Sequence, residues 1–288
     1  MSAQLLDGKV LAKKIKNQLR EEIIRLKQKT KSVPCIKNIM VGDEPAAISY
    51  ANSQKEIADD VGLQCSLVNL PSKFSQKDLL KQIEQLNRDQ GVHGVMIYKP
   101  LPSQLDYTLT VNHIDSIKDL EGMNIANLGK MVLGETSIIP CTPASVMEHI
   151  KSTGMSLRGK EAVIVGRSEI VGKPLMLLLL QQSATVTVCH TGTKDAGTLA
   201  EHIGRADILI TAIGKPGFIK GDWVKAGSIV IDVGINKIGE KIIGDVEFDS
   251  VVQKASFVTP VPGGVGPVTV VLLMKNAIEA FKLQMKVS

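Results

Sequence analysis

Hydrophobic residues recur along the first third of the chain with two alternating periods, one typical of helices and one of buried strands. A spacing of three and four residues predicts an amphipathic helix over residues 7–27. Pro45 fits the first turn of a helix that runs to Val61, and Gly62 suits the position that ends it. The elements predicted in this part are helix 7–27, strand 36–41, helix 45–61, strand 64–70, helix 76–88 and strand 92–98. This alternation indicates a parallel sheet with helices on its faces.

A second series of strands and helices begins after a less regular stretch. Residues 101–142 contain a helix-like part at 103–114 and a glycine-rich part at 119–134, and the segment 140–143 then opens another helix. The strands predicted beyond it are short and apolar: 162–165, 185–189, 207–212 and 228–233. Such strands are typical of the buried centre of a doubly wound sheet. A last helix is predicted over 268–283, and the pattern alone leaves open which part of the chain it packs against.

The length of 288 residues exceeds that of a usual single domain. We therefore expect a two-domain α/β protein whose domains change near Ile138. Residues 1–138 would form a three-layer α/β domain, and residues 139–267 would form a Rossmann-like domain. Aromatic residues make up only 3% of the chain, so the cores must be built from aliphatic side chains.

Composition narrows the class of function. The net charge of +5 is spread along the chain, which argues against nucleic-acid binding but suits a basic pocket for an anionic ligand. The four cysteines are isolated, so neither a metal site nor a disulfide framework is expected. The start of the chain lacks a signal or transit pattern, and the apolar run 175–180 is too short to span a membrane. We expect a cytoplasmic protein without membrane contact.

A glycine-rich turn between a predicted strand and a predicted helix is the first candidate for chemistry. Gly166 and Gly172 lie within the segment 161–174, and Ser168 stands where the common dinucleotide fingerprint has its middle glycine. Gly166 permits a tight turn, Gly172 permits close packing of helix on strand, and N–H groups at the start of the helix can bind phosphate. The alternative is a structural turn that binds no dinucleotide.

Residues near the end of the following strand indicate which dinucleotide would bind. NAD-binding domains usually place a carboxylate there for the ribose 2′-hydroxyl. Here residues 189–194 contain no carboxylate, and the first one after the strand is Asp195. Arg167, His190 and Lys194 lie near that position instead, which favours the 2′-phosphate of NADP. A surface ion pair is the alternative role for Arg167, and a structural role is the alternative for His190.

Several long motifs follow one another in an order that points to a family. The segment Val165–Pro174 is similar to the cofactor motif of the methylenetetrahydrofolate dehydrogenase/cyclohydrolase family. Further segments that resemble this family are 140–143, 212–218, 220–225, 231–236 and 259–267. The resemblance extends along nearly the whole chain.

The resemblance implies an architecture and two activities. An N-terminal folate domain would face a C-terminal NADP-binding domain across a cleft, and the last helix, within 268–288, would return to the first domain. Members are typically homodimers. They oxidise 5,10-methylenetetrahydrofolate with NADP and hydrolyse the resulting methenyl compound to 10-formyltetrahydrofolate. The implied cofactor is NADP, and the implied partners are tetrahydrofolate one-carbon derivatives.

The resemblance also assigns binding residues. Those expected to bind the cofactor are Thr142, Gly166, Arg167, Ser168, Gly172, His190 and Ile235. Those expected to bind the substrate are Tyr50, Glu121, Pro262, Gly263 and Gly264. The glycines of the loop 259–267 would let its backbone approach both ligands, and the alternative is a structural turn alone.

One position departs from the family in a way that bears on catalysis. The family carries a catalytic lysine four residues after a tyrosine on the second helix, and here Tyr50 is followed at that distance by Gln54. Hydrolysis requires activated water, and glutamine cannot act as a base. Lys55 is adjacent, but one step along a helix turns a side chain by roughly 100°. The resemblance therefore implies that the hydrolytic step is weak or lost.

Two further departures affect the same catalytic group, which comprises Tyr50, Gln54, Tyr98 and Glu121. Tyr98 replaces a glutamine of the family, and Glu121 replaces an aspartate that binds the pterin ring. Strand alternation would point Lys99 away from Tyr98, which argues against Lys99 as a substitute base. The main hypothesis is a dehydrogenase with weak or absent cyclohydrolase. The alternatives are a fully bifunctional enzyme, a dinucleotide-dependent relative with a changed substrate, and a non-catalytic paralogue.

Overall fold

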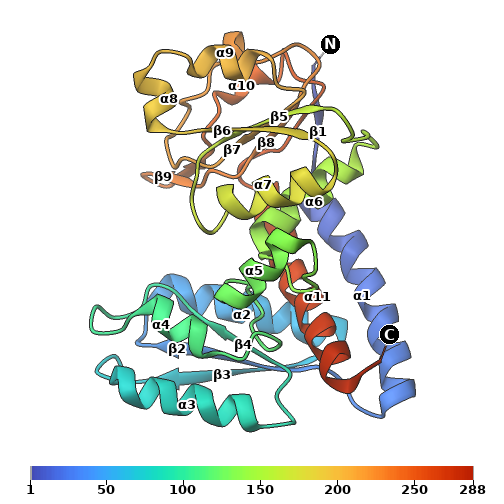
Figure 1. The fold of residues 1–288 in the computed structure, drawn as a ribbon, viewed down its shortest axis with the longest axis vertical. Helices are drawn as coiled ribbons and strands as arrows, with labels where there is room; N and C mark the ends of the chain where they lie inside the picture. Colours follow the sequence, from blue (N-terminus) through green and yellow to red (C-terminus); the bar gives the residue numbers. More distant parts are fainter. Residues whose placement is uncertain (1, 288) are drawn as a thin grey trace. The chain divides into compact units, whose positions relative to one another are not determined.

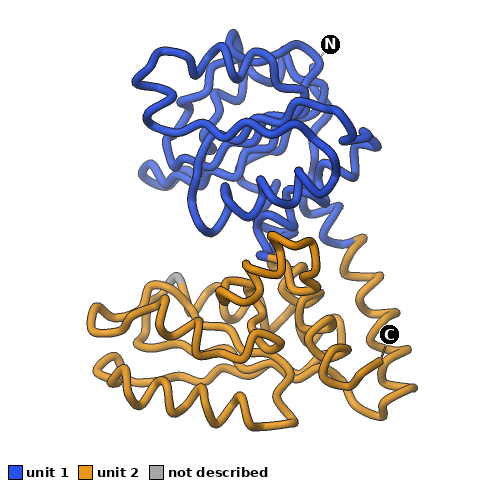
Figure 2. Tube along the Cα trace, viewed as in Figure 1, with its two compact units in different colours: residues 1–13, 140–269 blue, residues 14–139, 270–288 orange. Residues whose placement is uncertain are grey.

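The computed structural model describes residues 2–287 and divides the chain into two compact units (Figure 2). Unit 1 comprises residues 1–13 and 140–269, and unit 2 comprises residues 14–139 and 270–288. Two long helices, α1 (Gly8–Thr30) and α11 (Val265–Met285), each contribute residues to both units.

A parallel six-stranded sheet forms the centre of unit 1 (Figure 1). Its strands lie in the order β1-β11-β8-β7-β5-β6. Their bounds are β1 Gln4–Leu5, β5 Glu161–Val165, β6 Thr185–Cys189, β7 Ile208–Thr211, β8 Ile229–Asp232 and β11 Phe257–Val258. Every residue of β7 and β8 is buried, as their apolar sequences predict for central strands.

Helices cover both faces of this sheet, with α6 and α7 on one face and α9 and α10 on the other (Figure 1). Side chains from β5, β7 and β8 form a core with Leu199 and Ile203 of α9 and Val251 of α10. The remaining elements of unit 1 are α6 Cys141–Ser152, α7 Gly172–Gln181, α8 Thr191–Asp195, α9 Leu199–Gly204, a 3-10 turn at Gly221–Trp223, β9 Asn236–Ile238, β10 Lys241–Ile243 and α10 Phe248–Val251. Strands β9 and β10 pair as an antiparallel hairpin.

Unit 2 contains a three-stranded parallel sheet in the order β3-β2-β4. Its elements are β2 Cys35–Val41, α2 Pro45–Val61, β3 Gln64–Leu70, α3 Gln76–Arg88, β4 Gly94–Ile97, α4 Tyr107–His113 and α5 Ile125–Leu133. Helices α2 and α3 lie on opposite sides of the sheet (Figure 1). Leu79 and Ile83 of α3 and Val111 of α4 pack with residues of β2 and β4 in one core. Gly62 ends α2 in the left-handed conformation, with φ +90°, as its sequence position predicts.

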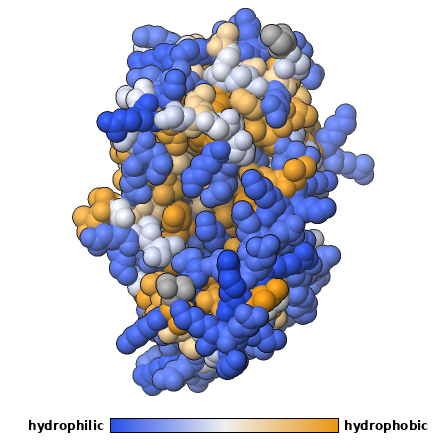
Figure 3. Space-filling model, turned by 90° about the vertical axis from the view of Figure 1, so that its right-hand side faces the viewer, coloured by the Kyte–Doolittle hydropathy of each residue, from blue (hydrophilic) through white to orange (hydrophobic). Residues whose placement is uncertain are grey.

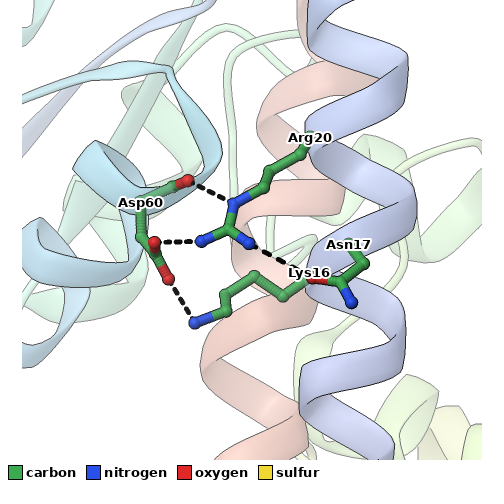
Figure 4. A network of polar contacts seen from close by, with 4 residues as sticks. All are labelled: Lys16, Asn17, Arg20 and Asp60. Atoms are coloured by element: carbon green, nitrogen blue, oxygen red, sulfur yellow. Dashed lines mark hydrogen bonds and ion pairs between the residues drawn. The ribbon is translucent and has the colours of Figure 1, made fainter.

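An acidic residue near the end of α2 ties this helix to α1 (Figure 4). The Asp60 carboxylate forms ion pairs with Lys16 and Arg20, one turn apart on α1. Arg20 Nε also donates to the backbone oxygen of Asp60 at 2.6 Å, so it binds one of the carbonyl groups left without a partner at the end of α2. Asn17 accepts a further hydrogen bond from Arg20.

The structure differs from the expected elements at three places. Residues 1–13 belong with unit 1 and not with the rest of 1–138, because Gln4–Leu5 pairs with Phe257–Val258 at the edge of the large sheet. The stretch 119–134 contains helix α5, which Asn124 caps by accepting from Ala126 N. The predicted helix 103–114 begins only at Tyr107, because Asp106 caps the backbone N–H of Leu109.

The last helix supplies buried polar contacts within unit 2. Asn276 Nδ2 donates to the backbone oxygens of Leu120 and Ile139, each at 2.8 Å. Gln284 Nε2 donates to the backbone oxygen of His93 at 2.7 Å. These bonds fix residues of α11 against the segment that carries Leu120 and therefore against the neighbourhood of Glu121.

Residues 2–287 contain neither a candidate membrane span nor a candidate metal site. None of their helices combines the length and apolar character needed to cross a membrane. No group of three or more histidine, cysteine or acidic side chains among them is arranged to hold a metal ion. Hydrophilic residues cover much of the face drawn in Figure 3, with hydrophobic residues in separate groups between them.

Candidate functional site

A cavity of about 320 Å³ lies in unit 1 at the carboxyl ends of β5, β6 and β7. Ligands of parallel α/β sheets bind at this edge of the sheet. The lining residues are Val165, Gly166, Arg167, His190, Thr191, Lys194, Leu199, Ala212, Ile213, Lys215 and Phe218.

Close backbone approach explains the two glycines of the first turn. Gly166 has φ +130°, and a Cβ atom there would lie 2.4 Å from the backbone oxygen of Ala212. A Cβ atom on Gly172 would lie 2.3 Å from the backbone oxygen of Gly166. Ser168 Oγ accepts hydrogen bonds from the N–H groups of Val171 and Gly172, at 3.1 and 3.4 Å. Ser168 thus supports the start of α7 through its side chain.

The cavity carries positive charge at its rim. Arg167, Lys194 and Lys215 are exposed and line it, whereas Leu199 supplies apolar surface. None of the ion pairs found among residues 2–287 includes Arg167. An apolar wall with several cations suits a ligand that combines rings with phosphates, so these residues fit a phosphorylated dinucleotide. Lys215 was missed by the sequence analysis, although it lies in the family-like segment 212–218.

His190 has a structural role as well as a place in the cavity. Its Nδ1 accepts a hydrogen bond from the N–H of Gly192 at 3.1 Å, and the hydroxyl of Thr193 accepts one from the N–H of His190. The ring therefore caps α8 while lining the cavity. Both alternatives raised for this residue are compatible with its position.

Other expected ligand residues of unit 1 lie outside the lining of this cavity. Ile235 is 70% exposed, and Thr142 is partly exposed in the first turn of α6. Gly263 has φ +105° and its backbone oxygen accepts from the N–H of Gly8 at 2.8 Å. Gly264 is buried, and a Cβ atom there would lie 2.6 Å from the backbone oxygen of Pro260. Pro262, which is exposed, follows a cis peptide bond.

Gln54 lies at the centre of a buried hydrogen-bond network in unit 2. Its side chain is fully buried, and its Oε1 accepts from the hydroxyl of Tyr98 at 2.6 Å and from Nδ2 of Asn38 at 2.8 Å. Asn38 Nδ2 also donates to the hydroxyl oxygen of Tyr98 at 3.0 Å. The Nε2 group of Gln54 contacts Sδ of Met96 at 3.4 Å. Asn38 was missed by the sequence analysis. The feature that could have identified it is a polar residue among the otherwise apolar buried positions of β2.

Tyr50 and Tyr98 face each other beside this network. Their rings meet edge to face with centroids 6.1 Å apart. Tyr98 is 3% exposed and Tyr50 is 37% exposed, so the pair runs from the interior to the surface. Burial raises the pKa of the Tyr98 hydroxyl far above its usual range, and the charge of Glu121 acts in the same direction. Tyr98 is therefore a neutral hydrogen-bond donor to Gln54 at physiological pH.

Lys55, the adjacent lysine, points away from this network. Its Nζ forms an ion pair with the Asp59 carboxylate at 2.7 Å, and both side chains are more than half exposed. The hydrogen bond that Lys55 donates to Asp59 raises the pKa of Lys55. A general base needs a lowered pKa, so this lysine has neither the position nor the protonation state to replace the family's lysine.

Lys99 contacts an aromatic ring outside this network. Its Nζ lies 3.4 Å from the ring centroid of Tyr107, which is a cation–π geometry. Tyr98 contacts Gln54 instead, so the two neighbouring side chains have different partners. Both residues follow the end of β4 at Ile97, so strand alternation does not decide their directions. Tyr107 was not among the residues expected from the sequence.

Glu121 lies beside Tyr107, two residues after Asp119. Asp119 forms an isolated parallel bridge with Val95 of β4, which positions the turn that carries Glu121. The Tyr107 hydroxyl is 3.5 Å from Oε2 of Glu121. Burial, together with the charge of Asp119, raises the pKa of Glu121 to about 7, although Lys99 acts to lower it. Glu121 is thus a carboxyl group that titrates near neutral pH.

The two units define a class of protein. A parallel α/β sheet carries a cationic cavity for a dinucleotide, and a second α/β unit carries a cluster of tyrosine, amide and carboxyl groups. This combination is typical of a dinucleotide-dependent enzyme with a separate substrate-binding unit.

Comparison with known proteins identifies the family. Residues 6–121 match the model of the tetrahydrofolate dehydrogenase/cyclohydrolase catalytic domain, and residues 140–285 match that of its NAD(P)-binding domain. The chain belongs to the tetrahydrofolate dehydrogenase/cyclohydrolase family. The predicted family, the two-domain α/β fold and the dinucleotide-binding domain are thereby confirmed.

Individual relatives support the same assignment. The bifunctional protein FolD of Moorella thermoacetica is 45% identical over 281 residues, which cover 97% of this chain and 99% of the relative. The crystal structure of the bifunctional enzyme FolD from Campylobacter jejuni has a TM-score of 0.94 at 42% identity and covers 98% of this chain and 99% of its own. The Trypanosoma brucei enzyme, solved with NADP cofactor and an inhibitor, has a TM-score of 0.93 at 34% identity, with 99% of both chains covered. The chain is an enzyme of folate-linked one-carbon metabolism, and the roles of its individual residues stay predictions.

Proposed function

We propose that this enzyme oxidises 5,10-methylenetetrahydrofolate to 5,10-methenyltetrahydrofolate with NADP and hydrolyses the methenyl product slowly or not at all. The observation that carries this proposal is the buried Gln54 side chain, whose Oε1 accepts two hydrogen bonds. The position at which the family has a basic amine is occupied here by a neutral hydrogen-bond acceptor.

The oxidation requires little acid or base catalysis by the protein. NADP, when bound, accepts the hydride from the methylene carbon, and the folate nitrogens stabilise the cation that remains. The protein has to hold both partners at reacting distance. The cavity lined by Arg167, Lys194 and Lys215 suits the cofactor, and Tyr50 and Glu121 are the expected folate contacts.

The hydrolysis requires more acid and base catalysis by the protein. Water must add to the methenyl carbon, one carbon–nitrogen bond must break to leave the 10-formyl group, and one proton must be released. A base is needed for the water proton. Gln54 cannot supply it, Lys55 is held outside by Asp59, and Lys99 lies on the ring of Tyr107. These contacts support a slow hydrolytic step.

Product analysis of the purified enzyme tests the proposal. Methylenetetrahydrofolate is supplied with NADP, and the reduced cofactor, the methenyl compound and 10-formyltetrahydrofolate are followed together. We expect methenyl product to accumulate nearly in step with reduced cofactor. If 10-formyltetrahydrofolate appears at the rate of cofactor reduction, the enzyme is fully bifunctional, as its relatives' names state. If cofactor is not reduced at all, the dehydrogenase proposal fails.

Thermal-shift measurements with NADP and with folates separate the remaining alternatives. A relative with a changed substrate would bind NADP but gain no thermal stability from any folate. A non-catalytic paralogue would bind both ligands without turnover. We also propose a homodimer, as the family resemblance implies, and light scattering of the purified protein gives the mass that checks it.

A further inference from the structure

The loop that follows β7 forms one wall of the dinucleotide cavity. Ile213, Lys215 and Phe218 all line it. Gly214 has φ +64°, a conformation that other residues seldom adopt. The shape of this loop therefore decides where the Lys215 side chain and the Ile213 surface meet a ligand.

A single buried carboxylate binds three consecutive N–H groups of this loop. Asp245 Oδ2 accepts from the N–H of Ile213 at 2.7 Å and from that of Gly214 at 3.2 Å. Asp245 Oδ1 accepts from the N–H of Lys215 at 2.9 Å and from Nδ2 of Asn236 at 3.0 Å. Backbone N–H groups that converge in this way form an anion-binding concavity, which here is filled by the protein's own side chain.

A second buried carboxylate holds Asp245 in place. Asp232, at the end of β8, accepts from the N–H groups of Asp245 and Val246, each at 3.0 Å. It also accepts from the hydroxyl of Thr211, the last residue of β7, at 3.1 Å. Asp232 and Asp245 thus connect the ends of two central strands to the loop that lines the cavity.

The surrounding backbone leaves room for both carboxylates. A Cβ atom on Gly234 would lie 2.3 Å from Cγ of Asp245, and one on Gly244 would lie 1.9 Å from Oδ2 of Asp232. Asp245 is fully buried and Asp232 is 1% exposed, and no ion pair among residues 2–287 includes either. Burying carboxylates without a cation is costly, so stability alone is a poor explanation for the arrangement.

We infer that Asp245 is a positioning residue for the dinucleotide, because it fixes the backbone of residues 213–215 and with it the Lys215 side of the cofactor cavity. Asp232 supports it by accepting hydrogen bonds from the N–H groups of Asp245 and Val246. This inference rests on the proposed use of NADP, but it concerns binding and not turnover. Neither carboxylate lines the cavity itself, so the effect of both is exerted through the loop.

Direct cofactor binding to the free enzyme tests the inference. The only tryptophan, Trp223, packs edge to face on Phe218 with ring centroids 5.7 Å apart, so its fluorescence reports on the cavity wall. The Asp245→Asn variant keeps the shape of the side chain but turns one acceptor into a donor that opposes the loop N–H groups. We expect its Kd for NADP to rise at least tenfold, and its KM for the folate substrate to stay within about twofold.

One control variant and two further variants keep the test decisive. Asp249→Asn is the matched control, because Asp249 is exposed near the start of α10. The Kd of this variant for NADP should equal that of the parent. If Asp245→Asn does not fold, Gly214→Ala strains the same loop at φ +64°, and Asn236→Ala removes one donor to Asp245. Both should weaken NADP binding. An NADP Kd within twofold of the parent in the folded variants would overturn the inference. If the parent enzyme binds NADP but does not reduce it with methylenetetrahydrofolate, the proposed reaction fails, and the Kd values of the variants still decide the inference.

Discussion

The hydroxyl of Tyr98 donates a 2.6 Å hydrogen bond to Oε1 of Gln54, and both side chains are buried in unit 2. Each residue occupies a position where the family resemblance implies a different side chain. The two replacements hydrogen-bond to each other, and Nδ2 of Asn38 donates to both of them. The site is therefore a buried network of neutral groups, and we interpret the loss of the basic amine as one part of a joint change.

Removing the acceptor of this network should destabilise the protein. In Gln54→Leu the hydroxyl of Tyr98 and the amide of Asn38 lose their shared acceptor in the interior. An unsatisfied buried polar group costs about 1–3 kcal/mol, so we expect the free energy of unfolding to fall by that amount. Denaturant unfolding measures it. Lys55→Gln, one residue along on the exposed side of α2, is the control and should change it by less than about 0.5 kcal/mol.

The glycine turn of the cofactor site gives a second prediction. Gly172→Ala places a Cβ atom 2.3 Å from a backbone oxygen, so the turn must open. We expect a loss of about 1–3 kcal/mol in stability and a clear loss of NADP affinity. Gly129→Ala on α5 is the matched control, because a Cβ atom there meets nothing within 4 Å. That control should be neutral or slightly stabilising, and equal effects of the two substitutions would contradict the account.

The cation beside the turn should select between the two dinucleotides. If Arg167 contacts the 2′-phosphate, Arg167→Gln will lower kcat/KM for NADP by about tenfold to a hundredfold and leave kcat/KM for NAD nearly unchanged. Arg205→Gln serves as control, because Arg205 donates to Thr187 and does not line the cavity. An equal loss with both dinucleotides would assign Arg167 a structural role.

Glu121 gives a prediction about pH. Its pKa is raised from 4.5 to about 7, so between these values the folded protein binds a proton that the unfolded chain has lost. The free energy of unfolding should therefore decrease as the pH rises through this interval, and the loss should be complete above the folded pKa. Thermal unfolding at a series of pH values measures it. Glu121→Gln should reduce the slope in that interval, where Asp232, whose pKa burial raises to about 6, also contributes. An unchanged slope would show that Glu121 is not responsible.

Local features of the sequence predicted most of the fold. Pro45 and Gly62 mark the ends of α2 because their backbone preferences act within a few residues. Strand β1 was missed because two residues carry no periodicity, and only pairing with Phe257–Val258 makes them a strand. Gln54 could be singled out from the sequence, but its partner Asn38 could not, because they meet only when β2 and α2 pack together. The bonds from the 213–215 loop to Asp245 are likewise long-range.

The central claim is that Gln54 limits the hydrolytic step. Its most direct test is the rate of hydrolysis of methenyltetrahydrofolate, without dinucleotide, by the parent enzyme and by Gln54→Lys. Burial beside Tyr98 would lower the pKa of the introduced lysine, which is the property that a base requires. We predict slow hydrolysis by the parent and an increase of at least tenfold in the variant. Fast hydrolysis by the parent, with no gain in the folded variant, would contradict the account.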